Sequence, residues 1–189
     1  MNWIFGALEE LLPVVVFFVI QQQFSFTTGL IAMTIVLFVV LLVAQILGRS
    51  LPRFAIMSTI GFLLFAVPSI VTGNSTYFQI SDTILDGSFA LLLLSSWVLG
   101  YPILKVFFGR IFAITDEAWL MLTWRWGMLF LLLAIANEYV RQFHTDDVWS
   151  LYKLLSTIGI MLFGCYQFTL SARLRIVSES NWLGLRTRT

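Results

Sequence analysis

The sequence is short of charged residues, of cysteine and of histidine, and each shortage argues against a class of protein. Charged residues make up 11% of the 189 positions, about half the share that is usual in soluble domains. The formal net charge is +1, so the chain cannot neutralise a phosphate backbone, and a dedicated nucleic-acid binder is disfavoured. Cys165 and His144 are the single residues of their types, which leaves no internal disulfide and no cysteine or histidine cluster for a metal.

The sequence has long uncharged apolar runs instead. Apolar residues make up 59% of the chain, and the mean hydropathy is +0.93. The runs 11–48 and 54–81 carry no charge, and each exceeds the ~20 residues that span a bilayer. We therefore predict an all-α, polytopic transmembrane helix bundle. Its five full spans are predicted at residues 29–47, 54–72, 83–104, 118–140 and 151–170, within a single membrane domain (1–170) that is followed by a basic, mobile cytoplasmic tail (171–189).

The first segment is ambiguous. Its uncharged core, 11–20, amounts to ~15 Å of helix, which is half a bilayer. Extended to 3–20 it is long enough to span but must then carry Glu9 and Glu10. A short or re-entrant membrane helix and a full span both fit, and the side that holds the N-terminus depends on which forms. Pro13 would kink such a helix or mark its start.

The basic residues are unevenly distributed between the loops. If the five spans alternate, eight of the eleven basic residues fall on one side: Arg49, Arg53, Lys105, Arg110, Arg173, Arg175, Arg186 and Arg188. The positive-inside rule then places that side, and with it the C-terminus, in the cytoplasm.

Aromatic residues near the span ends indicate contacts with the membrane interface. The segment 105–114 is too charged to span and too apolar for a free loop, so we predict that it lies in the interface. Phe107, Phe108 and Phe112 would then enter the lipid. Asp116 and Glu117 follow and open the next helix, where acidic groups suit the helix dipole. Tryptophans near or beyond span ends are expected to anchor at the interface, and three fit this description: Trp97, Trp149 and Trp182.

Four charged residues lie inside the predicted spans, namely Asp86, Arg125, Glu138 and Lys153. Such charges are costly and usually face protein or water. Near the outer surface Asp86, Glu138 and Lys153 would cluster with Asp82, either as an ion or substrate vestibule or, as we expect, as a packing clamp. Glu138 and Asp86 are the acidic side chains nearest in depth to Lys153.

Arg125 lies deeper, about 10 Å into its span. It could snorkel to the cytoplasmic surface. It could also pair with Glu9 or Glu10, if the first segment enters from the same side to a similar depth. We predict the pairing, with the first segment crossing or nearly crossing the membrane. The connection 21–28 is short, so this segment must then return beside the next span as a hairpin.

Trp119, Trp126 and Asn137 share one face of the span 118–140, because they are spaced by seven and eleven residues. This pattern predicts helix packing, with Asn137 hydrogen-bonded to a neighbouring helix; ligand stacking is the alternative. His144 beside Asp146 and Asp147 is a weak metal set that is typical of a solvated loop. The chain has no common hydrolase, metalloprotease or phosphate-binding motif, so we expect no enzymatic activity and no catalytic, cofactor-binding or metal-binding residue.

A series of residues begins with Glu10 and the run LLPVVVFF at 11–18 and continues along most of the chain. Its members are Pro13, Phe17, Phe18, Trp97, Pro102, Gly109, Trp119, Trp126, Asn137 and Trp149. Their order and spacing resemble the bacterial inner-membrane-spanning septation protein A family, also called the YciB family. The resemblance covers about 10–170, and the glutamines at 21–23 and the arginine-bearing tail depart from it.

The resemblance implies a non-enzymatic multi-pass protein of the bacterial inner membrane. It implies support of envelope integrity, cell division and septation, by acting as a scaffold for envelope machinery. Expected partners are the lipid bilayer and other membrane proteins of division or wall elongation. The alternative, which comes from the residues themselves, is a small transporter or channel that uses the four intramembrane charges.

Overall fold

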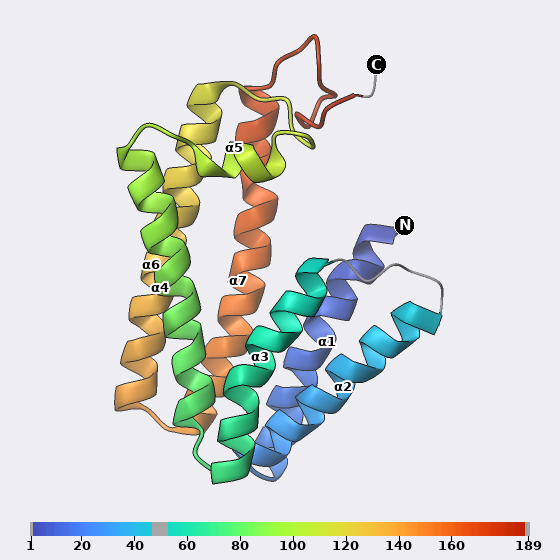
Figure 1. Ribbon diagram of the computed structural model, residues 1–189, viewed down its shortest axis with the longest axis vertical. Coiled ribbons are helices and arrows are strands. Elements are labelled where there is room, and N and C mark those ends of the chain that lie inside the picture. The colour runs from blue at the N-terminus through green and yellow to red at the C-terminus, as the bar shows by residue number, and fades with distance from the viewer. Residues whose placement is uncertain (1, 47–52, 188–189) are drawn as a thin grey trace. The chain divides into compact units, whose positions relative to one another are not determined.

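The computed structural model describes residues 2–46 and 53–187, with side chains described for 12–46 and 59–187. This part of the chain is all-α, as the sequence predicted. Its helices are α1 (Asn2–Gln23), α2 (Phe26–Ile46), α3 (Arg53–Thr72), α4 (Thr76–Val98), α5 (Ile103–Phe108), α6 (Asp116–Phe143) and α7 (Asp146–Arg173) (Figure 1).

Three of these helices, α2, α6 and α7, are long and apolar enough to cross a membrane. The described parts of α1 and α3 add the shorter apolar helices Leu12–Gln23 and Thr59–Thr72. α4 has 23 residues, but Asp82 and Asp86 make its first half more polar. Length and composition thus identify three helices in the described chain that could span a membrane. They do not confirm the predicted total of five spans.

The largest difference from the predicted boundaries is in α4, which was expected at 83–104. The helix begins at Thr76, where the Thr76 backbone N–H donates to Asn74 Oδ1 at 3.0 Å. It ends at Val98 because Gly100 adopts a positive φ of 69°, a conformation that terminates helices. α4 therefore begins about two turns before the predicted span, and Asp82 lies well inside the helix rather than directly before it.

α1 is a single helix of 22 residues that runs through Pro13. It forms a hairpin with α2, and the two helices touch at Gly29. A Cβ atom at Gly29 would lie 2.8 Å from the Cβ of Gln21 and 2.9 Å from the backbone oxygen of Phe17. The close approach of the helices therefore requires glycine at this position. The predicted hairpin is confirmed.

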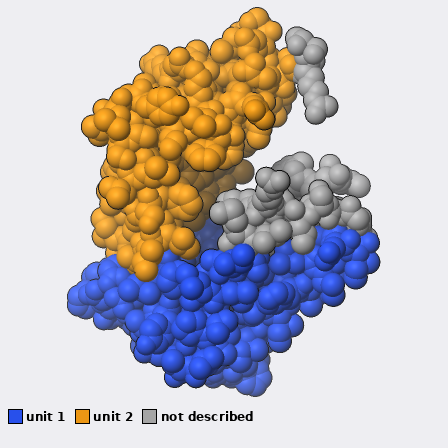
Figure 2. Space-filling view, in the orientation of Figure 1, with its two compact units in different colours: residues 1–82, 137–157 blue, residues 83–136, 158–189 orange. Residues whose placement is uncertain are grey.

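The chain divides into two compact units (Figure 2). Unit 1 comprises residues 1–82 and 137–157, and unit 2 comprises 83–136 and 158–189. α4, α6 and α7 each contribute one end to each unit. The sequence suggested a single domain over 1–170 with a separate tail at 171–189, whereas this division assigns the C-terminal residues to unit 2.

Unit 1 is built around an aromatic cluster of Phe17, Phe26, Phe78 and Trp149. Its ring centroids lie 5.2–6.4 Å apart, mostly in edge-to-face arrangements, the geometry that aromatic pairs favour. Trp149 is 0% exposed, so the predicted role of this residue as an interfacial anchor is wrong. α7 begins before Trp149, and the helical backbone directs its ring towards α1 and α2.

Unit 2 has a core of Ile114, Ala118, Trp119, Leu122 and Leu170. α4 and α6 approach closely in this unit, where a Cβ atom on Gly127 would lie 2.8 Å from the Cδ2 of Leu94. Small residues allow such close contacts between membrane helices. The predicted start of α6 is confirmed: the helix begins at Asp116, and the Ala118 backbone N–H donates to Thr115 Oγ1 at 3.3 Å.

Residues 174–187, which we call the C-terminal clip, are bonded to the connection between α5 and α6. The Thr115 N–H donates to the Leu174 oxygen at 3.0 Å, and the Ala113 N–H donates to the Gly184 oxygen at 2.9 Å. Two further backbone bonds join the same segments: Ile176 N–H to the Ala113 oxygen, 2.9 Å, and Arg186 N–H to the Ile111 oxygen, 2.7 Å. A mobile tail was expected, but the clip is tied by its backbone to unit 2.

Candidate functional site

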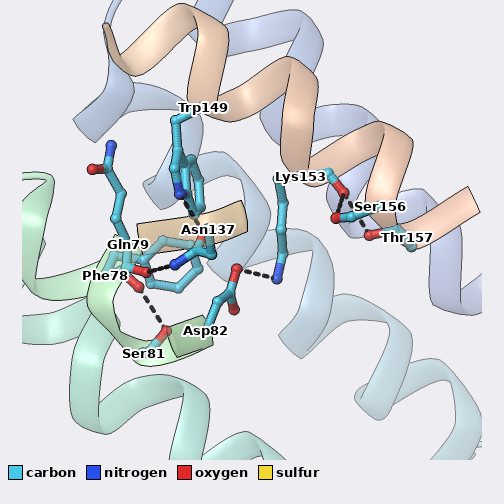
Figure 3. Close-up of polar contacts among 9 residues, drawn as sticks. All are labelled: Phe78, Gln79, Ser81, Asp82, Asn137, Trp149, Lys153, Ser156 and Thr157. Atoms are coloured by element: carbon cyan, nitrogen blue, oxygen red, sulfur yellow. Dashed lines mark hydrogen bonds and ion pairs between the residues drawn. The ribbon is translucent and has the colours of Figure 1, made fainter. Parts of the chain in front are cut away.

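An ion pair joins α7 to α4 in unit 1. Lys153 Nζ lies 2.6 Å from Asp82 Oδ2, and the two side chains are 24% and 15% exposed (Figure 3). The sequence favoured Glu138 and Asp86 as acidic partners, and the structure corrects this. Because α4 begins at Thr76, Asp82 lies six residues into its helix and Lys153 seven residues into α7, so the two lie at matching depths of ~10 Å.

Glu138 is bound along its own helix. It accepts from Arg141 Nη2 at 2.5 Å and from Arg141 Nε at 3.0 Å, and Gln142 Nε2 donates to the same carboxylate. The four intramembrane charges are thus divided between the units. Glu138 and Lys153 belong to unit 1, whereas Asp86 and Arg125 belong to unit 2.

Asn137 connects three helices in the centre of unit 1. Its Nδ2 donates to the backbone oxygen of Gln79 on α4 at 2.9 Å. Its Oδ1 accepts from the Trp149 Nε1–H of α7 at 2.8 Å (Figure 3). Asn137 is 0% exposed, and a buried amide with both ends bonded is costly to disturb. The sequence predicted a bond from Asn137 to a neighbouring helix, and the structure shows bonds to two.

The sequence reading missed Asp146 and Asp147, which it assigned to a solvated loop. Asp146 Oδ1 accepts from Ser75 Oγ at 2.9 Å and from Gln79 Nε2 at 2.8 Å. Asp147 accepts from Gln21 Nε2 at the end of α1. Both carboxylates lie in the first turn of α7, where the helix dipole favours negative charge. They therefore help to connect α7 to α1 and α4.

A signal for part of this network is present in the sequence. Gln79, Asp82 and Asp86 are spaced by three and four residues and therefore share one helical face. The relation of Asp82 to Asp86 was recognised from their spacing, but a span that starts at Thr83 leaves Gln79 outside the helix. The donors Gln21 and Ser75 leave no comparable pattern in the sequence. Gln21 lies near the end of α1, and Ser75 lies in the turn before α4.

The sequence also grouped His144 with Asp146 and Asp147 as a weak metal set. Its ring lies 5.6 Å from that of Tyr139. Within the described residues no group of three or more histidine, cysteine, aspartate or glutamate side chains could hold a metal ion.

Arg125 occupies a different setting in unit 2. Its Nη1 donates to Gln167 Oε1 at 3.2 Å, and its guanidinium lies 5.9 Å from the ring centroid of Tyr166. Both contacts come from α7. The expected partners, Glu9 and Glu10, lie outside the residues whose side chains the structure describes, so that pairing stays a prediction.

The residues that carry the family resemblance fall into both units. Phe17, Asn137 and Trp149 meet in the aromatic and polar centre of unit 1. In unit 2, Trp119 is buried and Trp126 packs edge-on against Phe163 at 5.0 Å. These five side chains therefore hold helices together.

The interfacial segment differs in part from its prediction. Phe107 and Phe108 are 65% and 44% exposed, as lipid contact requires. Phe112 instead packs against the core of unit 2, with its ring 5.9 Å from that of Phe168. Trp97 is 41% exposed and pairs with Trp124 at 6.4 Å.

Known proteins resemble this chain over most of its length. The profile of the family described as intracellular septation protein A matches residues 6–175. A protein of Afipia carboxidovorans named inner membrane-spanning protein YciB is 27% identical over 178 residues, which cover 94% of this chain and 89% of the relative. Proteins of the same name from Agrobacterium fabrum and Sinorhizobium fredii are also similar. The first is 35% identical over 122 residues (65% of this chain, 60% of the relative), and the second is 31% identical over 140 residues (74% and 65%).

No solved structure matches the chain significantly. The family profile covers nearly the whole chain, and the relatives are named for spanning the inner membrane. The helices α2, α6 and α7 are apolar enough to do so. This chain is therefore a membrane protein that belongs to the intracellular septation protein A family.

Proposed function

We propose that this protein is a non-enzymatic, multi-pass component of the bacterial inner membrane that supports envelope biogenesis and septation. It acts as a scaffold that binds membrane proteins of division or wall elongation. The observation that carries the proposal is the family match over residues 6–175, because the family is named for septation. The exposed apolar side chains of α2, such as Ile35 and Leu42, each 57% exposed, offer a surface to lipid and to partner helices.

The polar contacts favour a scaffold over a transporter. A transport path needs side chains that exchange their partners with a moving ion. Lys153 is bound to Asp82, Glu138 to Arg141, and Arg125 to Gln167. Each of these pairs connects neighbouring turns or neighbouring helices. Such contacts stabilise the bundle and leave the lipid-facing surfaces as the sites of action.

The proposal includes a topology. The C-terminus is cytoplasmic, since eight basic residues fall on that side by the positive-inside rule. α1 crosses the membrane beside α2, because its 22 residues correspond to ~33 Å of helix. A reporter that is active only outside the cytoplasm, fused after Thr189, should therefore stay silent. Activity of that fusion would contradict the topology.

The scaffold is tested by removing the gene and measuring cell length and sensitivity to wall-active drugs. We expect elongated, drug-sensitive cells that the wild-type gene restores. A photo-crosslinking residue at the exposed position of Ile35 should capture division or wall-elongation proteins in intact membranes. The same residue placed at the buried position of Leu30, 0% exposed, is the matched control. Normal division together with a changed uptake of an ion would instead support the transporter.

A further inference from the structure

The end of unit 2 that carries α5 exposes apolar side chains beside basic ones. α5 lies crosswise to α6 and α7 (Figure 1), so it runs along the membrane surface if these two helices cross the membrane. Val106 and Phe107 are 61% and 65% exposed. In the clip, Val177 and Trp182 are 74% and 72% exposed, although the segment around them is polar. Exposed apolar groups in such an arrangement are typical of segments that lie in the interface.

The clip and the α5 region form one surface because their backbones are bonded together. Ala113 donates to the Gly184 oxygen and accepts from the Ile176 N–H. Gly184 adopts a φ of 83°, and a Cβ atom there would lie 2.7 Å from the Ser171 oxygen. Both facts require glycine. A larger residue at position 184 would therefore displace the clip, and with it Trp182, from α5.

The charges of this surface are predominantly basic. The stretches 99–117 and 171–187 contain five basic and three acidic residues. Two acidic residues are bound locally, with Lys105 beside Asp116 and Arg186 Nη1 2.6 Å from Glu179 Oε2. Arg175 donates to the backbone oxygens of Ala172 and Trp182, at 2.9 and 3.5 Å, and so holds the clip. The exposed basic groups that complete this surface are Arg110 and Arg173.

We propose that this end of unit 2 is a binding surface for anionic phospholipid. Arg110 and Arg173 bind the phosphate of the headgroup, for which the planar guanidinium is well suited. Phe107, Val177 and Trp182 enter the boundary between headgroups and acyl chains. Because backbone bonds hold the clip, with Val177 and Trp182, to the α5–α6 connection, the surface is composite, and neither segment alone is sufficient.

The preference for anionic lipid is tested with the full chain in nanodiscs. Phosphatidylglycerol and phosphatidylcholine compete, and native mass spectrometry measures how much of each stays bound. We expect phosphatidylglycerol to be preferred. Arg110→Gln and Arg173→Gln should each lower the preference about fivefold, the factor that corresponds to about 1 kcal/mol per basic residue at an anionic surface. Arg141→Gln, at an arginine of unit 1, is the matched control and should leave the preference unchanged. An unchanged preference in the double variant Arg110→Gln/Arg173→Gln would overturn the proposal.

The composite nature of the surface is tested with Gly184→Val, which keeps every charge but displaces the clip. We expect the preference to fall although Arg110 and Arg173 remain, because Val177 and Trp182 are displaced from the surface. Gly159→Val should have no effect, because nothing lies within 4 Å of a Cβ atom at Gly159. If Gly184→Val fails to fold, a fluorophore on Trp182→Cys in a Cys165→Ser background gives the answer. Its emission should shift to shorter wavelength in bilayers that contain phosphatidylglycerol. Emission typical of water in those bilayers would contradict insertion of the clip.

Discussion

The two units bind a basic side chain within a long helix in different ways. In unit 1, Lys153 is bound to the carboxylate of Asp82 at 2.6 Å, and both side chains are mostly buried. In unit 2, Arg125 is bound to a neutral amide at 3.2 Å and lies over a tyrosine ring. A charge paired with a charge loses much when one partner is removed, since the other stays behind in a poorly solvated place. A charge held by a neutral amide leaves no such partner.

The cores of the two units also differ in how many bonded polar side chains they contain. Unit 1 combines its aromatic cluster with bonded amides and carboxylates, above all Asn137, Gln79 and Asp146. Unit 2 has an apolar core and close contacts at glycine, at Gly127 against Leu94 and at Gly184 against Ser171. Close approach at glycine also occurs in unit 1, at Gly29, so what sets unit 1 apart is its bonded polar side chains.

The largest expected effect is at the centre of unit 1. Trp149→Ala removes a fully buried ring and the donor to Asn137, and it should lower the free energy of unfolding by ~3–5 kcal/mol. Thermal unfolding of the purified protein in detergent measures the change. Trp182→Ala, at a tryptophan that is 72% exposed, is the matched control and should have little effect. Equal losses in the two variants would contradict a core role for Trp149.

The ion pair comes next. Lys153→Met leaves Asp82 without its cation and should cost ~2–3 kcal/mol, less than a fully buried pair because the side chains keep some exposure. Adding Asp82→Leu should recover part of the loss. Adding Glu138→Gln instead should not, because Glu138 is bound by Arg141. Strict additivity of Lys153→Met and Asp82→Leu in thermal unfolding would rule out the pairing.

Disturbing the contact between α1 and α2 should lower the free energy of unfolding by as much as Lys153→Met or slightly less. Gly29→Val places side-chain atoms where a Cβ alone would meet Gln21 and the Phe17 oxygen, and overpacking of this kind costs ~1–3 kcal/mol. Gly159→Val is the control, since that position is open. Thermal unfolding again provides the measurement, and an unaffected Gly29→Val protein would contradict the close hairpin.

The smallest effect is expected for Arg125, and it sharpens the contrast with Lys153. Arg125→Met removes one hydrogen bond and one contact with a ring but also removes a charge from the span, so the net loss should stay below ~1 kcal/mol. Gln167→Leu should be similarly mild. A loss as large as that of Lys153→Met would indicate a carboxylate partner for Arg125. The pairing with Glu9 or Glu10 would then be the explanation to test by double substitution.

Periodicity and charge distribution were sufficient for much of this molecule. The helical class, the apolar spans in α2, α6 and α7, and the packing role of the face with Asn137 all follow from local sequence. They do so because an uncharged run of this length in a membrane has to satisfy its backbone internally, and a helix does this within one segment. The start of α6 was also predictable, because Asp116 and Glu117 are acidic groups that suit the N-terminal end of a helix.

The partners of polar side chains were not readable in this way. The choice of Asp82 for Lys153 depends on where α4 begins, and a two-turn difference in that start moves Asp82 from directly before the span to six residues inside the helix. Asp146 and Asp147 have the composition of a solvated loop, yet they accept hydrogen bonds from residues more than sixty positions away. Phe112 and Trp149 were expected in the interface for their position, but packing turned both inwards.

The sequence by itself determined that this chain is a helical membrane protein and which residues carry the resemblance to its family. It also determined which loops between the helices are basic. The tertiary structure decided that the helices form two units, that the C-terminal residues are bonded to the α5–α6 connection, and which charge meets which. The physical reason lies in the range of the forces. Hydrophobic run length and helix propensity act within one segment. A hydrogen bond or an ion pair between two helices exists only where the fold brings two atoms within about 3 Å of each other.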